Sequence, residues 1–262
     1  MTQHSPDGVG QQIPPEVAAA AAAYQLGPYV ALFGPNRLPK RTAGAIIFGV
    51  LAVIGVVVLF TSFWPIGVLL LLACAFGAVQ FARSFSVTRS PRRIHLYAGG
   101  FVYVDPPAAP VVYRWDLIPA VYQSITKHYR NSVYTHTTYV YTVHGQGDAK
   151  VVLTNFWDRI EALGERIERE VTRVHLPMAV AALQRGEPLR FGDLTVAPNG
   201  LISEKRGLLP WSDIEKVQVR AGFIHVSRAG KWLSWSNTQV AHIPNLFVFL
   251  TLVDSLGPGI RR

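Results

Sequence analysis

The sequence has a single cysteine, Cys74, among 262 residues. A disulfide needs two cysteines, and thiolate-rich zinc or iron–sulfur sites need several. The sequence therefore excludes a disulfide framework and both kinds of metal centre. Cys74 lies in an apolar stretch, where we expect its small side chain only to pack.

Recognised catalytic motifs are missing as well. The sequence has no glycine-rich phosphate loop, no Gly-x-Ser-x-Gly turn and no His-Glu-x-x-His sequence. Its histidines are scattered, and His136 and His144 would lie about 27 Å apart in an extended strand, too far to share a metal ion. We therefore expect a non-enzymatic protein with no catalytic residues, no metal site and no cofactor.

Charged residues are scarce, at 16% of the chain against about a quarter in an average domain. No Asp or Glu occurs between Glu16 and Asp105. Basic residues instead flank an apolar segment within that stretch: Arg37, Lys40, Arg41, Arg83, Arg89, Arg92 and Arg93. This concentration of positive charge argues against nucleic acid as a partner, because such proteins spread cations over a folded surface.

The apolar segment runs from Thr42 to Ala82 without a charged residue or a histidine. A membrane-spanning helix needs about 20 apolar residues, and Pro65 suits the start of a second helix. The pattern predicts a two-helix transmembrane hairpin over 42–83, with spans at 43–62 and 65–82. The alternative is a buried helical hairpin. Basic residues on both sides predict a multi-pass protein of the cell (inner) membrane with both termini cytoplasmic.

For the rest of the chain, the sequence pattern predicts strands and helices. Residues 1–41 are expected to be disordered or briefly helical. Alternating Tyr, Val and Thr predict strands such as 134–143, preceded by a hairpin turn at Asn131 and Ser132. An apolar stripe at intervals of three or four predicts a helix after strand 150–153, with Asn155 as its N-cap.

Two β-rich stretches resemble each other. In each, a Gly-apolar pair is followed by Trp-(Asp/Ser)-x-Ile-x-x-Val, at Trp115 in the first stretch and Trp211 in the second, and a helix closes the unit. The expected fold class is α+β. It comprises the N-terminal transmembrane hairpin and two β-rich units, each closed by a C-terminal helix, over 84–184 and, in shorter form, 185–262.

This pattern resembles the bacterial pleckstrin-homology-like (PH-like) domains over 86–177 and 188–257. The whole layout also resembles a family of actinobacterial membrane proteins described only as a domain of unknown function. That second resemblance rests on the segments 114–118, 123–129, 163–167 and 190–196. It implies tandem PH-like units on a membrane hairpin, and it implies no established activity.

The candidate binding site is the hairpin around Asn131, which carries Lys127, His128, Arg130 and His136. Such cations near a membrane can engage anionic lipid headgroups, and the alternative is a solvated hairpin tip. The expected function is a membrane scaffold or adaptor whose cytosolic PH-like units bind a protein partner or anionic lipid. Exposed strand edges can hold peptides, which gives a protein partner at least equal weight. The alternative function is that of an accessory subunit of a membrane transport or enzyme complex.

Overall fold

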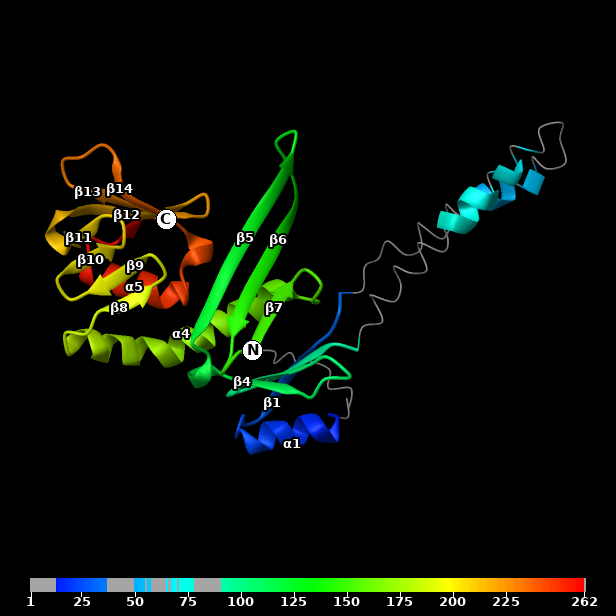
Figure 1. Ribbon diagram of the computed structural model, residues 1–262, viewed down its shortest axis with the longest axis horizontal. Helices are drawn as coiled ribbons and strands as arrows, with labels where there is room; N and C mark the ends of the chain where they lie inside the picture. The colour runs from blue at the N-terminus through cyan, green and yellow to red at the C-terminus, as the bar shows by residue number, and fades with distance from the viewer. Residues whose placement is uncertain are drawn as a thin grey trace, which may run out of the picture.

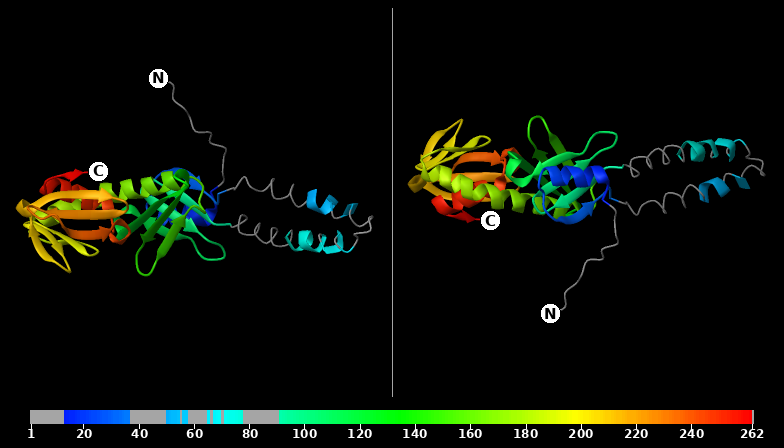
Figure 2. Two further views of the ribbon diagram at one scale, coloured as in Figure 1. Left: turned by 90° about the horizontal axis from the view of Figure 1, so that it is seen from above. Right: turned by 90° about the horizontal axis from the view of Figure 1, so that it is seen from below.

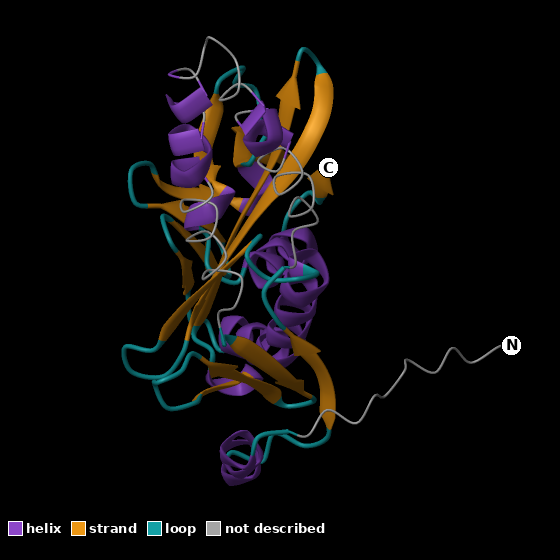
Figure 3. Ribbon diagram, turned by 90° about the vertical axis from the view of Figure 1, so that its right-hand side faces the viewer, coloured by secondary structure: helices purple, strands orange, loops and turns teal. Residues whose placement is uncertain are grey.

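The computed structural model describes residues 13–36, 50–54, 56–57, 65, 67–69, 71–77 and 91–261. Strands are the predominant regular elements of the two units in which the chain folds (Figure 3), and they form four small sheets. The two units lie end to end along the length of the molecule (Figure 2).

The first unit has two sheets and a long helix (Figure 1). A four-stranded antiparallel sheet has the order β1-β2-β3-β4, with β1 at Tyr29–Phe33, β2 at Arg93–Tyr97, β3 at Gly100–Val104 and β4 at Val111–Arg114. A 3-10 turn, η1 (Trp115–Leu117), leads into a sheet of order β5-β6-β7, with β5 at Ala120–Arg130, β6 at Val133–His144 and β7 at Lys150–Thr154. Helix α4 (Ile160–Gln184) follows.

The second unit repeats this order of elements. Its first sheet contains β8 (Leu189–Phe191), β9 (Leu194–Ala197), β10 (Gly200–Ser203) and β11 (Gly207–Pro210). The turn η2 (Trp211–Asp213) precedes β12 (Ile214–Arg220), β13 (Phe223–Arg228) and β14 (Ser234–Gln239). The turn η3 (Val240–His242) and helix α5 (Leu246–Leu256) follow, and a short last strand, β15 (Ile260–Arg261), pairs parallel with β12.

Matching contacts explain the sequence repeat. The indole N–H of Trp115 donates to the carbonyl of Ala98 at 2.9 Å, and that of Trp211 donates to Ala197 at 3.1 Å. In both units the tryptophan therefore ties the turn between the two sheets to the preceding hairpin. A Cβ at Gly100 would lie 2.2 Å from a carbonyl oxygen of the neighbouring strand, and so would one at Gly200. The repeated glycines are there because the backbones approach too closely for any side chain.

Helix α4 belongs to both units. Its N-terminal half packs Leu163, Ile167 and Val171 into the core of the first unit. Its C-terminal half contributes Leu183 to the core of the second, with Leu176 and other partly buried residues beside it. One continuous helix therefore joins the two cores.

The first unit also includes a helix and a strand that precede the apolar segment in the sequence. Strand β1 pairs antiparallel with β2. One face of the sheet packs into the core of the first unit, and helix α1 (Pro15–Ala23) covers the opposite face through Val17 and Ala21. Both faces of β2 and β3 are consequently buried. The short helix expected within 1–41 is present as α1, and the structure adds strand β1, which the sequence did not predict. Residues 1–12 and 37–41 lie outside the described residues.

The predicted α+β fold with a transmembrane hairpin over 42–83 is wrong. The described chain is mostly β-sheet, and none of its helices is long and apolar enough to cross a membrane. Its helical residues in this segment are 50–54, 56–57, 65, 67–69 and 71–77, and the other residues of the predicted spans 43–62 and 65–82 are not described. The prediction rested on apolar composition over about 20 residues for each span, and no described helix in this segment has that length. The integral membrane association and the multi-pass membrane localisation inferred from that run are corrected with it.

Candidate functional site: a cleft beside an open strand edge

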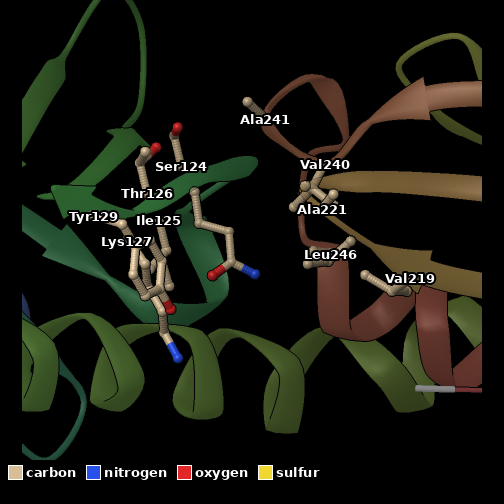
Figure 4. A pocket seen from close by; sticks show the side chains of 12 residues that line it. Ser124, Ile125, Thr126, Lys127, Tyr129, Val219, Ala221, Val240, Ala241 and Leu246 are labelled. Carbon is tan, nitrogen blue, oxygen red and sulfur yellow. The ribbon is translucent and has the colours of Figure 1, made fainter. Parts of the chain in front are cut away.

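A cleft of about 700 Å³ lies between the two units (Figure 4). One wall is strand β5, and the other comes from the second unit. The residues that line it are Gln123, Ser124, Ile125, Thr126, Lys127 and Tyr129 on one side, and Val219, Ala221, Gly222, Val240, Ala241 and Leu246 on the other. Ligand sites commonly have volumes of about 300–1,000 Å³, so the cleft has room for one.

Asn245, which precedes the cleft residue Leu246, joins the two units. It precedes α5 with a φ of 50°, a left-handed conformation that asparagine tolerates better than most residues. Its backbone N–H donates to the carbonyl of Val121 at 2.8 Å, and its side-chain oxygen accepts from the N–H of Val121 at 3.0 Å. Its side-chain amide also donates to the carbonyl of Pro119 at 3.0 Å. Asn245 therefore pairs with the start of β5 much as a neighbouring strand would.

Beyond Val121 the same edge of β5 is open. β5 is the outer strand of its sheet, and no strand in the described part of the chain pairs with its second edge. Since backbone groups alternate in direction along an antiparallel strand, the outward N–H and C=O of Val121 place those of Gln123, Ile125 and Lys127 toward the cleft too. We call these three residues, with the backbone between them, the open edge.

The side chains around the open edge make the cleft mainly apolar. Ser124 and Thr126 point to one side of β5, whereas Ile125 and Lys127 point to the other, toward α4 (Figure 4). Val219, Val240 and Leu246 form the facing wall. Lys127 is the one charged residue in the lining, and it forms no ion pair with the residues that the structure describes. The cleft therefore offers backbone hydrogen-bonding groups, an apolar wall and a single positive charge.

The predicted hairpin residues are distributed over two faces. Asn131 and Ser132 both have positive φ, 49° and 63°, which confirms the predicted tight turn. His128 and His136 lie opposite each other with ring centroids 4.4 Å apart, and Nε2 of His128 is 2.9 Å from the hydroxyl of Thr138. Lys127 precedes His128 in the strand, so its side chain lies on the opposite face, next to the cleft.

The other predicted basic residues are placed as follows. Arg130 pairs with Val133 at the base of the hairpin turn and is exposed. Arg92 forms a salt bridge with Asp105 at 3.0 Å, and Arg93 begins β2. The remaining members of the predicted basic set lie outside the described residues: Arg37, Lys40, Arg41, Arg83 and Arg89. Of the predicted cations that the structure describes, only Lys127 lines the cleft.

A buried carboxyl group lies in a small pocket next to the cleft, where α4 meets the second unit. We call this pocket the seam. Glu168 of α4 is buried and lines this small pocket together with Asn245, Leu246 and Phe247 of the second unit. Burial, followed by the nearby charge of Glu165, raises the pKa of Glu168 to about 8. At neutral pH this carboxyl is therefore mostly protonated and adds little negative charge to the seam.

Sequence reasoning singled out Lys127, which lines the cleft, but it did not indicate the other features of the cleft. Asn245 reads as an ordinary residue after a proline, and only the structure pairs it with a strand 124 positions earlier. The open edge itself has no side-chain signature, because it consists of backbone groups. No group of three or more His, Cys, Asp or Glu side chains that could hold a metal ion is found among the described residues.

Comparison with known proteins places the chain in a family. No curated protein and no solved structure matches the sequence. One family matches residues 4–258, nearly the entire chain, and it is described as "Family of unknown function (DUF6585)". The chain therefore belongs to this family of unknown function.

Proposed function

We propose that this protein is a non-enzymatic scaffold built from two PH-like units, which captures an extended segment of a protein partner along the open edge of β5. The order of four strands, a turn, three strands and a helix in both units supports the PH-like assignment. The observation that carries the binding role is the row of outward backbone groups at Gln123, Ile125 and Lys127 inside a cleft.

Strand addition is the binding mode that fits such an edge. Main-chain hydrogen bonds from an added strand supply affinity, and pockets beside it supply specificity. An unprotected edge is otherwise an aggregation hazard, which proteins commonly reduce by covering the edge or keeping it short. In this protein β5 has 11 residues, and among the described residues only Asn245 pairs with its outer edge, at the start of the strand. A partner segment would complete the sheet and fill the cleft at once.

The proposal is tested by selecting displayed random decapeptides on the purified full chain. We expect binders that are lost on Ile125→Pro, because proline removes the outward N–H of residue 125 and fills the space next to it. The ladder to β6 is retained, since that N–H does not point toward β6.

Ile125→Thr is the matched control. It keeps the backbone N–H and a β-branched side chain, so it should retain most of the binding. Peptides that bind Ile125→Pro as well as the unaltered protein, or a selection that yields no binders, would overturn the proposal.

A further inference from the structure

The two units carry equivalent strand edges. In the second unit this edge pairs with a further strand, whereas in the first unit no described strand pairs with it. Counting from the repeated tryptophans, Val121 of β5 corresponds to Val217 of β12, since each lies six residues after its tryptophan. Val217 pairs with Ile260 and Gln218 with Arg261 of β15. The second unit thus already holds an added strand on the edge that corresponds to the open edge of the first.

The added strand in the second unit runs parallel to β12. In the first unit the corresponding position, Val121, is occupied by the backbone and side chain of Asn245. β12 ends at Arg220, only three residues beyond Val217, whereas β5 continues for nine residues beyond Val121. The first unit therefore has the same docking edge, with a longer stretch left uncovered.

The charges in and beside the cleft indicate which side chains the captured segment should carry. Among the described residues that line the cleft, Lys127 is the one charged side chain. Glu168, a carboxyl of the neighbouring small pocket, has a pKa raised to about 8 by burial. An acidic side chain beside Lys127 would be attracted, and a basic one repelled. Apolar side chains at alternate positions would face Val219, Val240 and Leu246.

We infer that the captured segment runs parallel to β5, alternates apolar with polar residues, and places an acidic residue beside Lys127. This inference rests on the proposed function and specifies its ligand. Gln123, Ile125 and Lys127 each present one donor and one acceptor, and they span about 14 Å of extended chain. A segment of about six residues is enough to pair with all three.

The probe is an octapeptide of alternating Val and Thr with Asp at its sixth position, acetylated and amidated so that its ends are uncharged. A photoreactive diazirine is placed at its first or its last residue, and cross-links to the full chain are mapped by mass spectrometry. In the parallel arrangement, the first-residue label reaches residues around Gln123 and Leu246. The last-residue label reaches residues around Tyr129 at the far end of β5. Exchanged positions of the two labels would overturn the inferred direction.

Charge is tested with the same peptide carrying Lys in place of Asp. We expect the Asp peptide to bind about three- to tenfold more tightly, as for a partly exposed ion pair, and Lys127→Gln to remove the difference. Equal binding of the two peptides would overturn the acidic preference. These failures differ from failure of the proposed function, in which peptides bind Ile125→Pro unchanged or do not bind at all.

Discussion

Asn245 joins the two units by hydrogen bonds between residues far apart in the sequence. Its amide side chain and backbone N–H make three hydrogen bonds to Pro119 and Val121, more than 120 positions away in sequence. We predict that Asn245→Gly, which keeps the positive φ but removes the side chain, lowers the free energy of unfolding by about 1–3 kcal/mol. The partly buried N–H of Val121 loses its acceptor, and the exposed carbonyl of Pro119 loses a donor.

Asn155 provides the matched control for this prediction. Its side chain makes the same two kinds of hydrogen bond, to the backbone of Thr137 and Tyr139, but within the first unit. Denaturant unfolding followed by tryptophan fluorescence should show that Asn245→Gly uncouples the units, whereas Asn155→Gly destabilises only the first. Unchanged unfolding of Asn245→Gly would contradict the role given to this residue.

Gly164 permits the contact between α4 and β6. A Cβ at this position would lie 2.1 Å from the ring of the fully buried Tyr141. We expect Gly164→Ala to lower the free energy of unfolding by about 1–3 kcal/mol, since this overpacking outweighs the roughly 1 kcal/mol that alanine gains in helix propensity. Thermal or denaturant unfolding measures the effect.

A double variant separates overpacking from other causes. Replacing Tyr141 by Leu makes room for the added methyl group, so Gly164→Ala should cost less in the Tyr141→Leu background than alone. Additive costs of the two changes would show that the two side chains do not compete for the same space.

At the scale of elements, α4 carries a pH-dependent contribution through Glu168. The folded-state pKa, about 8, is above the usual value of 4.5, so the folded state holds the proton more tightly than the unfolded state. Stability is therefore fully present below about pH 4.5 and declines as the pH rises toward 8, by at most about 1.4 kcal/mol per pH unit from this one group. Glu168→Gln should remove this part of the decline and be the more stable protein above pH 8.

The control for that experiment is Glu165→Gln on the same helix. Glu165 is exposed and contributes less than burial does to the raised pKa, so most of the pH dependence should survive its replacement. Chemical denaturation at several pH values measures both variants. A pH dependence that is the same with and without Glu168 would contradict a buried, protonated carboxyl in the seam.

Elements with a strong local pattern could be predicted from the sequence. The alternation in 134–143 and the turn at Asn131 and Ser132 correspond to β6 and its hairpin turn. The start of α4 could not be predicted as well. Its N-cap is Arg159, because Asn155 uses its side chain to extend the ladder of β6 rather than to cap the helix. A side chain that hydrogen-bonds to backbone groups far away in the sequence leaves no pattern in the residues next to it.

At the scale of the molecule, the sequence repeat was informative and the apolar run was misleading. Trp115 and Trp211 mark equivalent turns because each indole donates to a carbonyl of the preceding hairpin in its own unit. The apolar segment between β1 and β2 suggested a membrane anchor by composition alone, and no described helix there meets the length that a span requires. The cleft was beyond prediction, since it depends on how α4 and Asn245 set one unit against the other.

The most direct test of the account is residue-resolved amide exchange along β5, with and without a peptide selected on the full chain. In the free protein, the amides of Ile125 and Lys127 should exchange faster than those of Ser124 and Thr126, which pair with β6. Bound peptide should slow Ile125 and Lys127 by at least about tenfold and leave Ser124 and Thr126 nearly unchanged. A peptide that binds without slowing Ile125 and Lys127 would contradict strand addition at the open edge.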